Sequence, residues 1–116
     1  MDSEDLRKRT KDFSLRIIAL VAALPRSRES AILGRQILKS GTSIGANYRE
    51  ALRASSKRQF TSIVEFSLRE AEETLYWLEL LAESKIVKPT RLKHLLDECD
   101  QLVAILVSTV RTAKRK

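Results

Sequence analysis

The 116-residue sequence predicts an all-α protein, folded as an antiparallel up-and-down four-helix bundle. Apolar residues recur at steps of three and four in four separate segments, which is typical of helices that each bury one face. Three glycines and two prolines leave few turns, and no run alternates as a strand would. The length suits a single domain over residues 1–116. We expect its helices at about 4–24, 28–54, 58–83 and 91–113.

The first connection is short and bounded by clear signals. Pro25 follows Leu24, and proline disfavours helical geometry in the residue before it. Ser27 is a good N-cap for the second helix, as Asp2 or Ser3 is for the first. A connection this short makes the first two helices antiparallel neighbours.

Three glycines lie on one face of the second expected helix, at Gly34, Gly41 and Gly45. Each glycine inside a helix costs roughly 0.5–1 kcal/mol relative to alanine. Their common face therefore predicts that another backbone comes close there. A break near residues 40–42, giving two shorter helices, is the alternative, and we favour a continuous helix because the apolar phase continues across the glycines.

A polar pair stands on the flank of the second and third helices. Asn47 lies beside the apolar face of the second helix, and Glu70 holds the equivalent position on the third. A buried amide needs a hydrogen-bond partner, so we expect Asn47 and Glu70 to share one polar network. Two independent surface residues are the alternative.

The third helix has more apolar surface than one neighbour can cover. Its apolar arc spans roughly 200°, wider than the ~100° stripe of a surface helix. Phe66 and Trp77 widen one shoulder of this arc, so we assign both to the interface of a homo-oligomer. The acidic residues Glu65, Glu72 and Glu79 lie opposite the seam and are interpreted as solvated acids rather than metal ligands.

No motif in the chain carries catalytic chemistry. Cys99 sits on the apolar stripe of the fourth helix, and His94 is the single histidine, without the companions that a metal site needs. No phosphate loop, nucleophile elbow or dinucleotide fingerprint occurs. We expect a protein that is not an enzyme and has no cofactor, metal or small-molecule substrate. The single cysteine, the charged N-terminus and the lack of a long apolar run predict a cytoplasmic protein without a membrane span.

The net charge of +7 is unevenly spread. Residues 1–58 hold 13 Lys and Arg against 6 Asp and Glu, residues 59–110 hold 5 against 9, and the last six residues add four positive charges. A basic first half and tail favour a polyanionic partner, although a basic surface can also serve solubility alone. Tyr48 and Tyr76 could stack on bases, but we interpret both as packing residues. The candidate nucleic-acid contacts are Arg7, Lys8, Arg9, Lys11, Arg26, Arg28, Arg49, Arg53, Lys57, Arg58, Arg111, Lys114, Arg115 and Lys116.

Two stretches of the chain, SGTSIGANYREA from Ser40 to Ala51 and SLREAEETLYWLELL from Ser67 to Leu81, closely resemble the 23S rRNA-intervening-sequence protein family, also called the four-helix bundle protein family. The resemblance implies a small bundle that assembles as a homopentamer. Some members are encoded within insertions in large-subunit rRNA genes, and related proteins are accessory factors of diversity-generating retroelements that bind nucleic acid through a basic pentameric surface. The glycine common after the motif glutamate is Ala51 here, so the second helix could continue past Glu50.

Two functions are compatible with these observations. The first is a basic homo-oligomer that associates with RNA or DNA without reading sequence. The second is a protein-binding scaffold or accessory subunit, for example of a reverse transcriptase, with no direct role in nucleic-acid binding.

Overall fold

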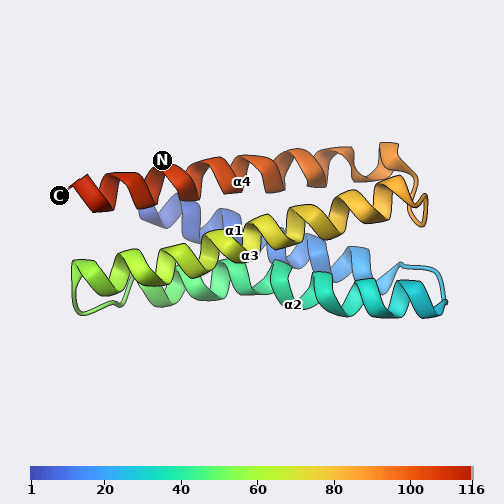
Figure 1. Cartoon of the computed structure of the whole chain (residues 1–116), viewed down its shortest axis with the longest axis horizontal. Helices are drawn as coiled ribbons and strands as arrows, with labels where there is room; N and C mark the ends of the chain where they lie inside the picture. The colour runs from blue at the N-terminus through green and yellow to red at the C-terminus, as the bar shows by residue number, and fades with distance from the viewer. Residues whose placement is uncertain (116) are drawn as a thin grey trace.

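The computed structural model describes residues 1–115, and they form four α-helices without a β-strand. The helices are α1 (Ser3–Ala22), α2 (Arg28–Ala51), α3 (Lys57–Glu83) and α4 (Pro89–Arg115). Short connections join them (Figure 1). The prediction of an all-helical bundle is confirmed.

The chain reverses direction at each connection, as Figure 1 shows. The α1–α2 and α3–α4 connections lie at one end of the bundle, which we call the loop end. The α2–α3 connection and both chain ends lie toward the other, which we call the terminal end. The bundle measures 46 × 21 × 19 Å. Each helix contacts the helices before and after it, and the ring closes through a sparser contact between α1 and α4.

Side-chain caps begin three of the helices. Asp2 Oδ1 accepts a hydrogen bond of 2.8 Å from the Asp5 amide, and Ser27 Oγ accepts one of 3.0 Å from the Ser30 amide. Ser56 caps α3 in the same way. These caps satisfy amides that have no partner inside the helix, which fixes where each helix begins.

Two helices end earlier than the sequence predicted. α1 ends at Ala22 because Pro25 prevents a further helical turn, and its last amides bond three residues back, Leu24 N to Val21 O at 3.2 Å. α2 ends at Ala51 rather than near Ala54, and the Ala54 amide likewise bonds three residues back, to Ala51 O. The turn therefore follows directly after Glu50-Ala51, without the common glycine, and the expected extension of α2 is wrong.

The glycine face of α2 packs on α1. α2 is continuous through all three glycines, as predicted. A Cβ at Gly41 would lie 2.9 Å from two side-chain atoms of Ile17, and one at Gly45 would lie 3.3 Å from the backbone carbonyl carbon of Thr10. The missing side chains therefore let α1 approach closely, which confirms the predicted role of the glycines.

Buried hydroxyl groups join α2 to α3 within the apolar core. Ser67 Oγ donates a 2.7 Å hydrogen bond to the Ile44 carbonyl, and the hydroxyl oxygens of Thr74 and Ser40 lie 2.8 Å apart. Small hydroxyl side chains satisfy their own polar atoms here while allowing the helices to pack closely.

The polar network predicted for Asn47 and Glu70 does not form within the chain. Both side chains are half-buried, and no hydrogen bond joins them anywhere in residues 1–115. The hydroxyls of Ser67 and Thr74 make the hydrogen bonds between α2 and α3 instead, without the Asn47 amide or the Glu70 carboxylate.

None of the four described helices is both long enough and apolar enough to cross a bilayer.

Candidate nucleic-acid interface

Two hollows lie between α1 and α2, on the side away from α3 and α4, and we call the two together the α1–α2 groove. The hollow nearer the terminal end has a volume of about 350 Å³, and its cations are Arg7, Lys11 and Arg49. The hollow at the loop end has a volume of about 400 Å³, and its cations are Arg26 and Arg35. No acidic residue lines either hollow.

The spacing of three arginines along α2 places their side chains on one face of that helix. Arg28, Arg35 and Arg49 lie at multiples of seven residues along α2, so they follow one another along the same outer face. Ser14, Gly45 and Ala46 line the hollow at the terminal end. These small residues leave space between the long basic side chains, so an extended anionic chain could approach the helix backbones there.

The positive charges of the groove are largely free of acidic partners. Arg7 forms a 2.7 Å ion pair with Glu4, which lowers the pKa of that carboxyl and raises the pKa of Arg7. Of the cations that line the two hollows, Lys11, Arg26, Arg35 and Arg49 take part in none of the ion pairs formed within residues 1–115. Four unpaired cations along one groove give a field that attracts phosphate.

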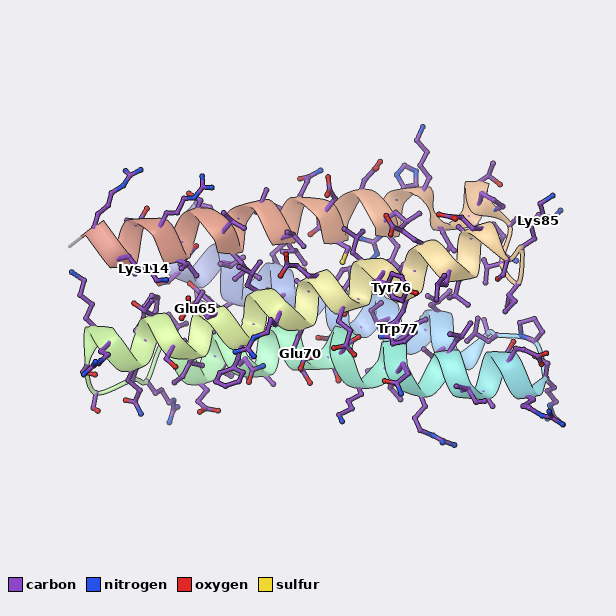
Figure 2. The ribbon with its side chains drawn as sticks, viewed as in Figure 1. Glu65, Glu70, Tyr76, Trp77, Lys85 and Lys114 are labelled. Carbon is purple, nitrogen blue, oxygen red and sulfur yellow. The ribbon has the colours of Figure 1, made fainter. Side chains whose placement is uncertain are left out.

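A second group of predicted cations, which we call the terminal cluster, lies at the terminal end. Its members in α3 and α4 include Lys57, Arg58 and Lys114, which border a hollow of about 990 Å³. Lys114 is partly neutralised by Glu65 at 3.0 Å, and Figure 2 shows these two side chains near one another. The other members are exposed and lie at the adjacent helix ends: Arg53, Arg111 and Arg115.

Two further predicted cations, Lys8 and Arg28, line neither hollow of the groove and are not part of the terminal cluster. They are exposed on α1 and at the start of α2, beside the α1–α2 groove. Lys116 lies outside the described residues. Arg35 belongs to the groove but was missed by the sequence analysis, although its seven-residue spacing from Arg28 could have revealed it.

Arg9 serves another purpose. Its guanidinium makes two 2.7 Å hydrogen bonds with the carboxylate of Glu98 and one of 2.6 Å with Gln101 Oε1. The hydrogen bonds that Arg9 donates to Glu98 raise the pKa of Arg9. The side chain therefore joins α1 to α4 with three of its five N–H donors, and it lies in neither the α1–α2 groove nor the terminal cluster.

Aromatic side chains lie on α3, away from the α1–α2 groove. Phe66 is 50% exposed and Tyr76 is 54% exposed, whereas Trp77 is half-buried and donates to Glu73 Oε1 at 3.2 Å. Figure 2 shows Tyr76 and Trp77 beside each other on α3. Tyr48 is buried in the core as expected, whereas Tyr76 lies outside the core and packs edge-on against Trp77.

Burial raises the pKa of the titratable groups of Cys99 and Glu70. The thiol of Cys99 is fully buried and donates to the Ala71 carbonyl at 3.4 Å, and burial raises its pKa to about 12. The pKa of Glu70 is raised by burial and by the neighbouring Glu73. Within residues 1–115, no three His, Cys, Asp or Glu side chains are grouped as a metal site requires.

Comparisons with known proteins agree on one family. No curated protein matches the chain. The solved structures include a protein of unknown function from the S23 ribosomal protein family of Bacteroides thetaiotaomicron VPI-5482. It is similar to this chain with a TM-score of 0.85 and 33% sequence identity, over 90% of this chain and 97% of the other. The family model described as 23S rRNA-intervening sequence protein matches residues 3–108. The chain therefore belongs to the 23S rRNA-intervening sequence protein family.

Proposed function

We propose that this antiparallel four-helix bundle is not an enzyme but a basic homo-oligomer, a pentamer by its resemblance, that binds the phosphate backbone of RNA or DNA through the α1–α2 groove. One observation carries the proposal: two successive hollows lined by cations and by no acid. Lysine and arginine side chains of this kind provide the sequence-independent part of nucleic-acid affinity. Five copies at +7 each would gather about 35 positive charges.

Binding of this kind would be insensitive to sequence. No aromatic side chain lines either hollow, so bases have no ring on which to stack. The contacts available are long cationic side chains, which hold phosphates without distinguishing one base from another. Lys57, Arg58 and the other cations of the terminal cluster would extend the same basic surface.

A charge-reversal variant tests the groove. Lys11→Glu combined with Arg49→Glu replaces two exposed cations without an ion pair, so the fold should survive. Affinity for a structured RNA should fall at least about tenfold, and the log–log salt slope should become shallower by about 2 units. The matched control is Lys88→Glu with Arg91→Glu, which makes the same change of charge directly before α4 and in its first turn. Equal losses in both variants would mean that net charge, rather than the groove, determines binding.

The oligomer is tested separately. Phe66 and Trp77 remain partly uncovered by the chain's own helices, which favours a contact with another polypeptide. Light scattering should give a mass several times that of the 13.2 kDa chain. Trp77→Asp should dissociate the assembly because an unpaired carboxylate would be buried at the contact. Leu15→Asp, an exposed position on α1, is the control. A wild-type protein that is monomeric would refute the assembly.

The same exposed aromatics favour the second candidate, a scaffold or accessory subunit for another protein. Arg69 lies over the Phe66 ring at 4.5 Å, and Tyr76 packs edge-on against Trp77 with centroids 5.2 Å apart. Aromatic and arginine side chains of this kind are common at the centres of protein interfaces. An oligomer that forms without nucleic-acid affinity at low salt would support this second function.

A further inference from the structure

The edge between α1 and α4 is open at the loop end. There, the end of α1, the start of α4 and the connection between α3 and α4 enclose a hollow of about 700 Å³, which we call the α1–α4 pocket. The helices touch only sparsely along this edge, and the ion pair of Arg9 with Glu98 closes it further toward the terminal end. The pocket is therefore a gap that this chain's own side chains do not fill.

The floor of the pocket is apolar and comes from three segments. It is lined by Leu20 and Leu24, in the last turn of α1 and directly after it, by Ile86 and Val87 of the connection, and by Leu92 of α4. All but Leu92 are only partly buried and lie against the edge of the core. Covering these side chains with an apolar group would remove more of their surface from water, and this is favourable in proportion to the area covered.

The rim of the pocket carries only positive or titratable basic groups. They are Arg16, Lys85, Lys88, Arg91 and His94, and no acidic residue lines the pocket. None of them takes part in an ion pair within residues 1–115. The pocket also lies at the N-terminal turn of α4, whose dipole favours negative charge. Figure 2 shows Lys85 at the opposite end of the bundle from Lys114, so this rim is separate from the terminal cluster.

The size of the pocket decides which class of ligand fits. Its α1 wall, from Arg16 to the end of the helix at Ala22, is about 9 Å long at 1.5 Å per residue. That length corresponds to about two helical turns, too short for the standard interface of about 1,600 Å² that a docked protein requires. A volume of 700 Å³ falls within the range of about 300–1,000 Å³ that is typical of small-molecule sites.

We propose that the α1–α4 pocket binds a medium-chain fatty-acid carboxylate, with the alkyl chain on the floor formed by Leu20, Leu24 and Ile86 and the carboxylate between Lys88 and Arg91. The apolar floor explains the chain, and the cationic rim without acids explains the anionic head. This ligand site uses none of the cations of the α1–α2 groove, although Leu24 and Pro25 line both the pocket and the hollow of the groove at the loop end.

Decanoate is the probe for this site. Isothermal titration calorimetry should show saturable binding at one site per chain, and NMR shifts should concentrate on the methyl groups of Leu20, Ile86 and Leu92. A cationic probe with the same alkyl chain, decyltrimethylammonium, should bind at least about tenfold more weakly because the rim repels it. Equal binding of the two probes would overturn the proposal, because it would show that only the alkyl chain is recognised.

Variants locate the site. Lys88→Glu with Arg91→Glu should weaken decanoate binding at least about tenfold, while acidic residues at the start of α4 suit its dipole and keep the helix stable. Lys57→Glu with Arg58→Glu is the matched control, since it makes the same two changes at the start of α3, and its decanoate affinity should equal that of the wild type. Equal losses in the two variants would overturn the proposal.

A third variant tests the floor. Ala23 is exposed at the edge of the pocket, next to the end of α1, where a larger side chain causes no backbone strain. Ala23→Trp should fill the pocket and abolish decanoate binding without unfolding the protein, as circular dichroism would show. Unchanged binding in a folded Ala23→Trp protein would place decanoate elsewhere and contradict the assignment.

Discussion

Of the three glycines of α2, Gly41 is the one at which an added Cβ would come closest to an atom of α1. Two side-chain atoms of Ile17, which is fully buried, occupy the space where a Cβ would stand, 2.9 Å from that position. Ile17 is β-branched and cannot easily change its rotamer. The absence of a side chain at Gly41 is therefore a packing requirement, although glycine weakens the isolated helix.

Gly41→Ala tests this packing. Alanine stabilises a helix by up to about 1 kcal/mol relative to glycine at an unhindered position. Here overpacking against Ile17 should outweigh this gain and make the substitution destabilising. We expect a net destabilisation of about 1–3 kcal/mol in urea unfolding. Thr42→Ala, one residue along on the outer side of α2, is the control and should change stability by no more than about 0.5 kcal/mol. A more stable Gly41→Ala protein would show that α1 can move away without cost.

The raised pKa of Cys99 predicts how the free energy of unfolding changes with pH in the alkaline range. Burial raises the pKa of its thiol from 9.0 to about 12 in the folded chain. The unfolded chain loses this proton above pH 9, whereas the folded chain keeps it, so the neutral thiol stabilises the fold below pH 9 and this stability is lost as the pH rises from 9 to 12. The slope is about 1.4 kcal/mol per pH unit.

The contribution of Cys99 can be isolated by substitution. Cys99→Ala should lack this part of the alkaline slope in denaturant unfolding, while tyrosines and lysines contribute equally to both proteins. A thiol reagent at pH 8 should modify the wild type only after denaturant is added. Rapid modification of the folded protein would contradict the buried, protonated state.

Individual residues also show how far sequence reasoning reaches. The caps at Asp2 and Ser27, the glycine face and the inner position of Cys99 were all predicted, since each depends on spacing within one helix. The ion pair of Arg9 was not predicted, because its partner Glu98 is 89 residues away in the chain. Only the packing of α1 against α4 brings the two together, and no local pattern contains that information.

At the scale of the helices, α1 and α4 form the weakest pair of neighbours, and a polar bridge strengthens it. The side chains of Arg9 and Glu98 are 24% and 19% exposed, and they meet through two hydrogen bonds. Water screens such a partly buried pair less than a surface pair. The bridge therefore stabilises the closure of the bundle on the side where apolar contacts are few.

A double-mutant cycle measures this bridge. Arg9→Ala and Glu98→Ala should each destabilise the fold, and their coupling energy should be about 1–2 kcal/mol. The pair of Arg7 and Glu4 is the control, and its coupling should be close to zero because its side chains are more exposed, at 38% and 71%, and water screens their attraction. Equal coupling in the two cycles would show that Arg9 and Glu98 do not fasten α1 to α4.

Helix number and approximate bounds could be predicted, because each apolar stripe repeats with the helical period. The ends of α1 and α2 were placed two and three residues too late, respectively, since both helices close with tighter turns before their connections. The flank of α2 and α3 was harder to predict. Asn47 and Glu70 have the right phase for a contact, but the hydroxyls of Ser67 and Thr74 make the hydrogen bonds instead.

Over the whole molecule, basic and acidic side chains lie on different faces and at different ends of the bundle. The α1–α2 groove and the terminal cluster are basic, while α3 carries a row of acids that includes Glu72 and Glu79. The sequence predicted that the first half is basic, because charge can be counted. It could not show which cations share a groove, since this depends on how the helices are rotated against one another.

The central claim is that phosphate binds along the α1–α2 groove, and the salt dependence of affinity for a duplex tests it most directly. Four unpaired cations, Lys11, Arg26, Arg35 and Arg49, imply a log–log slope of at least about −3 between ~50 and 200 mM salt. Fluorescence anisotropy with a labelled duplex, on protein whose mass is checked by light scattering at each salt concentration, gives that slope. A slope of −3 or steeper is the predicted result, and no binding at the lowest salt concentration by an intact oligomer would contradict it.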